Sequence, residues 1–135
     1  LGVVYKPLDH LLRLADVVSL HVPLTDATRH LIDAPKLALM KFSAVLINVA
    51  RGECVDEHAL AARLRSKQLG GAACDVFSQE PISADHPLLG LENALLTPHL
   101  AGATNEVRQR VVLMAVANLV RVLKGEPPQY VLSAG

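Results

Sequence analysis

The stretch 44-AVLINVARGECVD-56 decides the fold of this 135-residue chain, because a short apolar run stops there at an Arg-Gly pair. A continuous apolar run such as residues 44–47 is typical of a strand covered on both faces, as in a parallel sheet with helices on each side. Residues 48–52 then form the turn at its carboxyl end, where open α/β sheets bind ligands. Arg51 offers a planar fork of donors suited to a carboxylate, although a plain surface arginine is the alternative.

Strand-like and helix-like segments alternate on both sides of this stretch. Apolar runs bounded by Gly, Pro or Asp predict further strands at residues 2–5, 17–20, 72–77 and 93–97. Helical spacing and capping residues predict helices at residues 8–16 and 34–40, from residue 57 to the glycines at 70–71, and from residue 105 to Gly125. In the last helix, Val107, Val111, Met114 and Val122 share one side and form an apolar stripe. The pattern favours a doubly wound α/β domain with helices on both faces of a parallel sheet.

Amino-acid composition indicates which kinds of binding partner and which cellular location to expect. Thirteen basic and 13 acidic side chains give a net charge of zero, so bulk charge favours neither a nucleic-acid partner nor a membrane surface. Cys54 and Cys74 lack metal-ligand spacing, so we predict no metal site and interpret both as reduced core thiols, with a disulfide as the less favoured alternative. The sequence has no membrane-spanning run and no basic-then-apolar leader, which predicts a soluble, cytoplasmic protein.

Polar side chains gather at the ends of the predicted strands. Arg51 and Asp75 follow two of them, and Glu80 and His99 lie in loops beyond the same edge of the sheet. A carboxylate held against an imidazole stabilises the protonated ring, which suits a histidine that exchanges protons near neutrality. Taken singly, His99 could be a structural hydrogen-bonding residue and Glu80 part of an ordinary Glu-Pro turn.

Four segments, in order and spacing, resemble the signatures of the D-isomer-specific 2-hydroxyacid dehydrogenases. They are LLRLADVVSLHVPLTDATRHLID, MKFSAVLINVARGECVDEHAL, GGAACDVFSQEP and LLTPHLAGAT. The resemblance covers about residues 3–130 and departs at Cys54, where the family usually carries an aliphatic residue. It is nearer to the phosphoglycerate dehydrogenase and glyoxylate or hydroxypyruvate reductase branches than to the D-lactate branch.

The resemblance implies a role for each candidate residue. Arg51 would bind the carboxylate and carbonyl of a 2-oxo acid, His99 would be the acid-base group, and Glu80 would orient His99. Asp75 would hydrogen-bond the nicotinamide carboxamide of NAD, with NADP also possible. The other residues expected to line the cofactor, together with Arg51 and His99 themselves, are His21, Val22, Pro23, Val49, Ala50 and Gly102. We expect the remaining histidines to be solvated at the surface: His10, His30, His58 and His86.

One part of the dinucleotide-binding unit is missing from the sequence. That unit needs a strand, a G-x-G-x-x-G turn, a helix and a later acidic residue, and no such turn occurs here. The resemblance implies that residues 2–5 are the third strand of an NAD-binding domain. We therefore expect residues 1–135 to be a partial Rossmann domain, without its first two strands and without the substrate domain. The strand at Val17 would then be an unprotected edge, and the chain alone would neither bind NAD tightly nor turn over.

Three functions remain open at this point. The first is an oxidoreductase that transfers a hydride between NAD(P)(H) and a D-2-hydroxy acid and 2-oxo acid pair. The second is a non-enzymatic NAD-sensing regulator of the corepressor type, because such proteins resemble this family. The third is a catalytically inactive dimerisation module, since we expect the full-length protein to be a homodimer.

Overall fold

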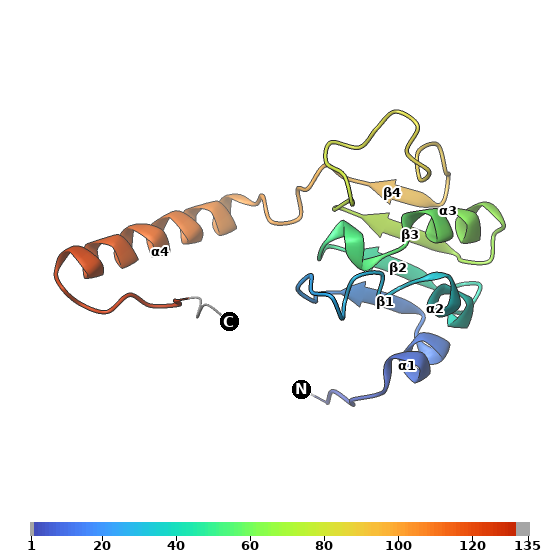
Figure 1. The fold of residues 1–135 in the computed structure, drawn as a ribbon, viewed down its shortest axis with the longest axis horizontal. Helices are drawn as coiled ribbons and strands as arrows, with labels where there is room; N and C mark the ends of the chain where they lie inside the picture. Colours follow the sequence, from blue (N-terminus) through green and yellow to red (C-terminus); the bar gives the residue numbers. More distant parts are fainter. Residues whose placement is uncertain (1, 132–135) are drawn as a thin grey trace. The chain divides into compact units, whose positions relative to one another are not determined.

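The computed structural model describes residues 2–131, which divide after His99 into two compact units (Figure 1). The first unit contains the whole sheet and three of the α-helices, and the second contains one long helix.

The first unit is built on a four-stranded parallel sheet whose spatial order follows the chain, β1-β2-β3-β4. The strands are β1 (Val17–Leu20), β2 (Val45–Asn48), β3 (Gly71–Cys74) and β4 (Ala94–Leu96). The parallel α/β architecture predicted from the sequence is confirmed, and β1 is an edge strand as expected. β3 ends three residues earlier than predicted, because residues 75–77 leave the sheet.

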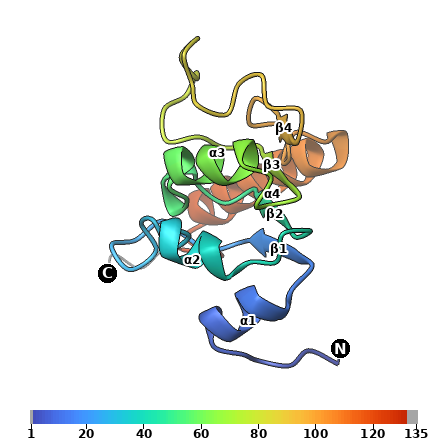
Figure 2. The ribbon, with the colours of Figure 1, turned by 90° about the vertical axis from the view of Figure 1, so that its right-hand side faces the viewer.

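Helices α1 (Leu8–Leu14), α2 (Ala34–Leu39) and α3 (Glu57–Arg65) connect to these strands, and a short 3₁₀ helix, η1 (Gly52–Cys54), precedes α3. Asp33 caps α2 by accepting a 2.9 Å hydrogen bond from the Lys36 amide. Asp56 caps α3 in the same way through the Ala59 amide, at 2.9 Å. Figures 1 and 2 show α2 and α3 on the same side of the sheet, as successive right-handed crossovers require.

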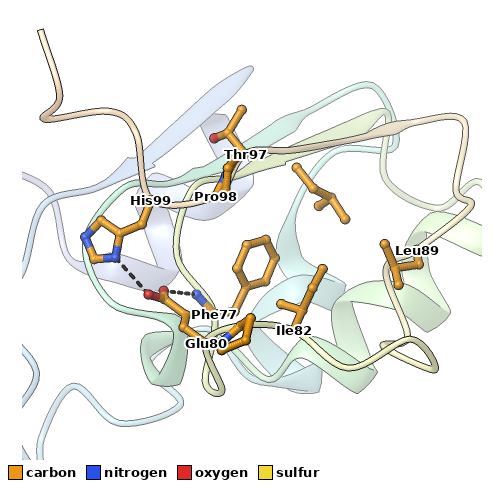
Figure 3. A pocket seen from close by; sticks show the side chains of 9 residues that line it. Phe77, Glu80, Ile82, Leu89, Thr97, Pro98 and His99 are labelled. Carbon is orange, nitrogen blue, oxygen red and sulfur yellow. Dashed lines mark hydrogen bonds and ion pairs between the residues drawn. The ribbon is translucent and has the colours of Figure 1, made fainter.

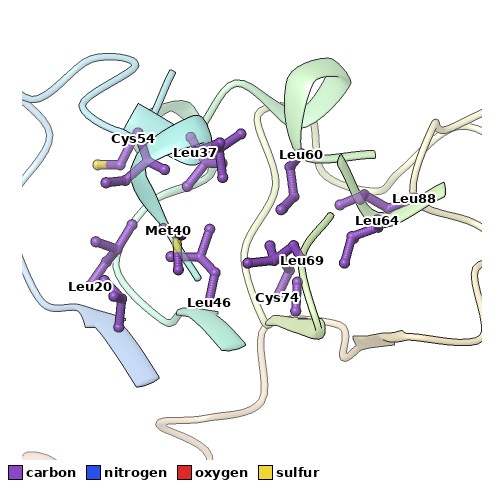
Figure 4. Close-up of a cluster of buried hydrophobic side chains, with 14 of the residues drawn as sticks. Leu20, Leu37, Met40, Leu46, Cys54, Leu60, Leu64, Leu69, Cys74 and Leu88 are labelled. Carbon is purple, nitrogen blue, oxygen red and sulfur yellow. The ribbon is translucent and has the colours of Figure 1, made fainter. Parts of the chain in front are cut away.

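The core lies between this helical layer and one face of the sheet (Figure 4). Alternate strand residues are buried, as in a sheet packed on one side. Leu46 of β2 and Leu37, Leu60 and Leu64 of the helices are each at most 1% exposed. Burying a leucine side chain contributes roughly 1.5–3 kcal/mol, so this layer supplies much of the folding free energy of the unit.

The opposite face of the sheet is partly exposed within the first unit. Val17 of β1 is 57% exposed and Leu95 of β4 is 64% exposed, although both are large and apolar. Both faces of the sheet thus carry apolar side chains. The described helices of this unit cover only one face.

The prediction of a strand at residues 2–5 is wrong. These residues have no regular secondary structure, and Val3, Val4 and Tyr5 are 72–90% exposed. A strand needs a neighbour to satisfy its backbone N–H and C=O groups, and within the described residues this segment pairs with none.

The two cysteines are free and buried, so the prediction of reduced core thiols is confirmed. Burial, with a smaller contribution from the nearby Glu57 charge, raises the pKa of the Cys74 thiol to about 12. A thiol with so high a pKa is not a nucleophile at neutral pH, so Cys74 is a packing residue.

The second unit consists of α4 (Asn105–Leu123) and the segment that follows it. Thr104 caps the helix by accepting a hydrogen bond from the Val107 amide at 3.2 Å, as the sequence predicted. Asn118 exchanges two 2.7 Å hydrogen bonds with the backbone of Gln129, which ties the segment back to the helix. No residue of α4 is buried, and Val107, Val111 and Met114 of its apolar stripe are 42–59% exposed.

Candidate functional site

The carboxyl ends of the four strands lie at one level of the sheet. Leu20, Asn48, Cys74 and Leu96 are paired in register across β1 to β4. The segments that follow these residues therefore start from the same edge, where a parallel α/β sheet binds its ligands. His21, Arg51, Asp75 and His99 all come from these four segments.

Asn48 holds the turn that carries Arg51. Its side chain is 1% exposed, accepts from the Ala50 amide at 3.1 Å and donates to the Arg51 carbonyl at 2.9 Å. Arg51 itself is exposed, and its guanidinium donates to the Ala50 carbonyl at 2.6 Å. The sequence analysis did not single out Asn48, although a polar residue on the buried face of a strand was a signal that could have identified it.

A hollow with a volume of about 650 Å³ opens beside Arg51. Its walls come from the segments after β1 and β2, and it is lined by His21, Val22, Pro23, Leu24, Val49, Ala50 and Arg51. Six of these seven are residues expected to line the cofactor, and Leu24 is the addition. His21 is further fixed by a 2.9 Å hydrogen bond between its Nε2 and the Ser19 hydroxyl.

Asp75 is buried between the Arg51 side of the edge and the His99 side. Its amide donates to the Asn48 carbonyl at 3.0 Å, and its carbonyl accepts from the His99 amide at 2.9 Å. One carboxylate oxygen accepts from the Thr97 hydroxyl, and the residue is only 6% exposed. Asp75 thus links two strand ends through its backbone while Thr97 orients its side chain.

Glu80 and His99 form the hydrogen-bonded pair expected from the sequence (Figure 3). The distance from His99 Nδ1 to Glu80 Oε2 is 2.9 Å, and Glu80 Oε1 accepts from the Phe77 amide, also at 2.9 Å. The bond from His99, and next the bond from the Phe77 amide, hold the pKa of the Glu80 carboxyl below its ordinary value. Because Glu80 occupies Nδ1, the opposite ring nitrogen, Nε2, is left to face a ligand.

The pair is held by strained backbone and remains accessible. His99 has a φ of 55°, a left-handed conformation that costs a non-glycine residue free energy and is often found at functional sites. Its side chain is 54% exposed and that of Glu80 is 36% exposed. A proton could therefore be exchanged here with a bound molecule.

An apolar cavity of about 450 Å³ lies against the same pair (Figure 3). Its walls come from β4, from the loop after β3 and from the pair itself, and its apolar lining includes Phe77, Ile82, Leu89, Leu96 and Pro98. Arg51 does not line this cavity, so the two expected halves of the site open into separate hollows. Gly102, the remaining expected cofactor residue, belongs to the second unit.

The expectation that His86 is a solvated surface histidine is wrong. His86 is 9% exposed, and its ring packs edge-on against Phe77 with the centroids 5.4 Å apart. Its Nε2 lies 3.3 Å from Glu57 Oε2, in a second glutamate–histidine pair. His10, His30 and His58 are exposed as expected. The loop that buries His86 gives no periodic pattern, so the sequence offered no burial signal at this position.

Residues 2–131 contain neither a metal-binding cluster nor a membrane-spanning helix. Among residues 2–131 no cluster of three or more His, Cys, Asp or Glu side chains could hold a metal ion. Within the same described range, no helix is both long enough and apolar enough to cross a membrane.

Comparison with known proteins identifies relatives over most of the chain. Residues 1–101 match the family described as D-isomer specific 2-hydroxyacid dehydrogenase, NAD binding domain. Glyoxylate reductase from Aeropyrum pernix is 48% identical over 128 residues, which are 95% of this chain and 38% of the relative. (S)-sulfolactate dehydrogenase from Chromohalobacter salexigens is 55% identical over 113 residues, covering 84% of this chain and 37% of the relative.

The likeness extends to the fold. The crystal structure of D-lactate dehydrogenase with NAD+ from Lactobacillus jensenii superposes with a TM-score of 0.90 at 32% identity, over 96% of this chain and 43% of that protein. The chain thus spans less than half the length of each of these relatives. With the family matched over residues 1–101 and the fold matched over nearly all of its length, the chain belongs to the D-isomer specific 2-hydroxyacid dehydrogenases, as part of their NAD-binding domain.

Proposed function

We propose that the full-length protein containing this chain is an NAD(P)-dependent dehydrogenase that interconverts a small D-2-hydroxy acid and its 2-oxo acid. The observation that carries this proposal is the Glu80–His99 pair, a carboxylate-bound imidazole with Nε2 free to face a ligand at the ligand-binding edge of the sheet. Family membership supplies the nicotinamide cofactor.

His99 is the proton donor and acceptor in this proposal. During reduction its Nε2 gives a proton to the oxygen that becomes the hydroxyl, and during oxidation the same nitrogen removes that proton. Glu80 holds the ring by Nδ1, so that Nε2 is left to face the substrate. Proton transfer by a well-placed side chain typically contributes 10²–10⁴-fold in rate.

Arg51 is the substrate anchor. Its guanidinium binds the carboxylate of the 2-oxo acid and polarises the neighbouring carbonyl, which stabilises the charge that develops on oxygen. The Asn48 amide fixes the Arg51 backbone from both sides of the turn, so the guanidinium starts from a rigid position.

The residues beside Arg51 fit one nucleoside half of the cofactor, a planar ring attached to a ribose. Small or apolar residues line the hollow there, and polar His21 and Arg51 stand among them, a combination suited to a planar ring with a ribose. Asp75 orients the carboxamide in this proposal. NADH, when bound, supplies the hydride that reduces the substrate carbonyl carbon. A glycine-rich pyrophosphate turn does not occur in the sequence, so we further propose that these 135 residues form only part of the domain.

The test is turnover by the full-length protein with NADH or NADPH and a panel of 2-oxo acids: glyoxylate, hydroxypyruvate and phosphohydroxypyruvate. The sulfolactate dehydrogenase relative adds (S)-sulfolactate, assayed in the oxidative direction. We expect NADH oxidation with at least one acid. Cofactor binding without turnover on any substrate would refute the enzyme proposal and favour the NAD-sensing regulator.

Arg51→Lys tests the anchor in the same assay. We expect a loss of about 10²-fold in kcat/KM, because an ammonium cannot reproduce bidentate contact with a carboxylate. Arg29→Lys, at another exposed arginine, is the matched control and keeps wild-type activity. Near-wild-type turnover by Arg51→Lys would contradict the role of Arg51.

A further inference from the structure

A second carboxylate, Glu57, lies between the two segments that carry the proposed catalytic residues. It is the first residue of α3 and follows the Arg51 turn by way of η1. Its Oε1 accepts from the Ser78 amide at 2.8 Å, and its Oε2 accepts from the Ser78 hydroxyl at 2.6 Å and lies 3.3 Å from His86 Nε2. Ser78 and His86 belong to the loop after β3, which also carries Glu80. One side chain therefore joins the two loops.

The Glu57–His86 contact is largely buried, which distinguishes it from an ordinary surface bridge, whereas Ser78 is exposed. The Glu57 side chain is 12% exposed and that of His86 is 7% exposed. No lysine or arginine pairs with Glu57 among the described residues. The hydrogen bonds from the Ser78 amide, the Ser78 hydroxyl and His86 must therefore compensate for the hydration that the carboxylate loses. The Leu88 amide lies 3.4 Å from His86 Nδ1, which assigns the proton of a neutral ring to Nε2, directed at Glu57.

The contacts continue from Glu57 to His99 through adjacent residues. Ser78, which Glu57 binds through both its amide and its hydroxyl, follows Phe77 in the chain. The Phe77 amide donates to Glu80 Oε1 at 2.9 Å, and Glu80 Oε2 binds His99. Binding of Ser78 by Glu57 thus restrains the backbone on the carboxyl side of Phe77, the residue whose amide binds Glu80.

Gly52 brings the same two segments into contact from the Arg51 side. A Cβ atom at Gly52 would lie 1.9 Å from the Phe77 carbonyl carbon and 2.1 Å from the Ser78 nitrogen. Backbone therefore packs directly on backbone where Glu57 binds. The substrate anchor and the acid-base pair are thus held to each other here as well as through the Asp75 backbone, although they open into separate hollows.

We propose that Glu57 is a positioning residue that sets the acid-base pair relative to the Arg51 turn by binding Ser78 and His86. This inference rests on the proposed function and extends it to a residue outside the catalytic set. Glu57 touches neither His99 nor the substrate anchor, so it acts through the Phe77 amide and Glu80. A misplacement of about 1 Å in such a pair can cost on the order of 10²-fold in rate.

The experiment is a double-mutant cycle in the full-length protein, with Glu57→Gln, Glu80→Gln and the two combined. The NH₂ group of a glutamine cannot accept a hydrogen bond, so it would face at least one of the three donors that surround Glu57. At least one hydrogen bond to Ser78 or His86 is therefore lost, while the shape of the side chain is kept. We expect Glu57→Gln to lower kcat about tenfold or more with a smaller change in KM. If Glu57 acts through Glu80, the double variant is no slower than Glu80→Gln alone, within about twofold.

Two further variants keep the inference testable if Glu57→Gln folds poorly. Ser78→Ala removes one of the three donors, and we expect a smaller loss of kcat that is also absent in the Glu80→Gln background. Glu53→Gln is the matched control, because Glu53 precedes Glu57 by four residues and has no side-chain hydrogen bond or ion pair in the described part of the chain. It keeps wild-type kcat.

Additive losses in the cycle would overturn the proposal, since a role in stability alone does not depend on Glu80. A second readout does not need activity. Amide hydrogen exchange of Phe77, followed by NMR, becomes faster in Glu57→Gln and stays unchanged in Glu53→Gln if the chain of contacts holds. If the wild-type protein turns over no 2-oxo acid, the proposed function fails, and the Phe77 exchange rate alone tests the positioning role of Glu57. An unchanged exchange rate in Glu57→Gln would then overturn that role.

Discussion

The first unit holds two glutamate–histidine pairs that have the same chemistry and opposite surroundings. In the Glu57–His86 pair both side chains are at most 12% exposed, whereas in the Glu80–His99 pair they are 36% and 54% exposed. The buried histidine packs edge-on against Phe77, and the exposed one has a left-handed backbone. Exposure therefore separates the pair that fixes a loop from the pair that can exchange a proton with a ligand.

Gly52→Ala should have the largest effect, because it acts on the backbone that supports both pairs. An added methyl group would overlap the Phe77 carbonyl carbon, where an ideal Cβ lies only 1.9 Å away, and neighbouring backbone cannot move aside cheaply. We expect the free energy of unfolding to fall by about 3 kcal/mol or more, measured by urea denaturation. Gly102→Ala is the control for general loss of a glycine, since nothing lies within 4 Å of its added Cβ and its backbone is not left-handed. Equal stability of the two variants would contradict this packing.

His99→Asn should remove most activity while leaving stability nearly unchanged. Asparagine tolerates the left-handed backbone at this position but cannot exchange a proton near neutrality. We expect a loss of about 10²–10⁴-fold in kcat for the full-length protein. The melting temperature should stay close to the wild-type value, because the side chain is more than half exposed. Retained turnover would refute the acid-base role.

The same substitution in the buried pair, His86→Asn, should lower stability and leave most of the activity. The shorter side chain cannot reach Glu57 and leaves space beside Phe77. We expect the free energy of unfolding to fall by about 1–3 kcal/mol, measured by urea denaturation, with a far smaller loss of activity than His99→Asn causes. If both substitutions changed activity equally, the distinction between the pairs would fail.

Lowering the pH should give the smallest effect and report on Glu80. The folded-state pKa of Glu80 lies below its ordinary value of 4.5, mainly because of the hydrogen bond from His99. The stabilisation is therefore fully present above that ordinary value and is lost as the pH falls through the lower folded-state pKa. Urea unfolding between pH 6 and pH 3 should show a shallower loss of stability for Glu80→Gln than for the wild type. Parallel curves would contradict the shift.

Local patterns predicted most of the fold. The apolar run at residues 44–47 and the caps Asp56 and Thr104 specify short-range structure, and the structure confirms each of them within a residue. Residues 2–5 carry the same local pattern but remain unpaired, since a strand depends on a neighbour as well as on its own sequence.

The candidate site was predictable where a strand end delivers a side chain. Arg51 and His99 follow strands in register, and Glu80 reaches His99 as expected. Asn48, Glu57 and His86 were missed, because their importance comes from contacts between segments far apart in the chain. Glu57 and His86 are 29 residues apart, and no periodicity links a helix start to the interior of a loop.

The order of the strands also bears on how the chain folds as it is made. Each strand of the first unit pairs with the strand that precedes it in the sequence, so no strand must insert between two others. Each pairing therefore closes the loop of one crossover only, and no pairing has to wait for a strand synthesised later. A ribosome adding about 5–20 residues per second would release β1, β2, β3 and β4 in the order in which they dock. We therefore expect the sheet to grow from β1 towards β4 during synthesis, with His99 placed last.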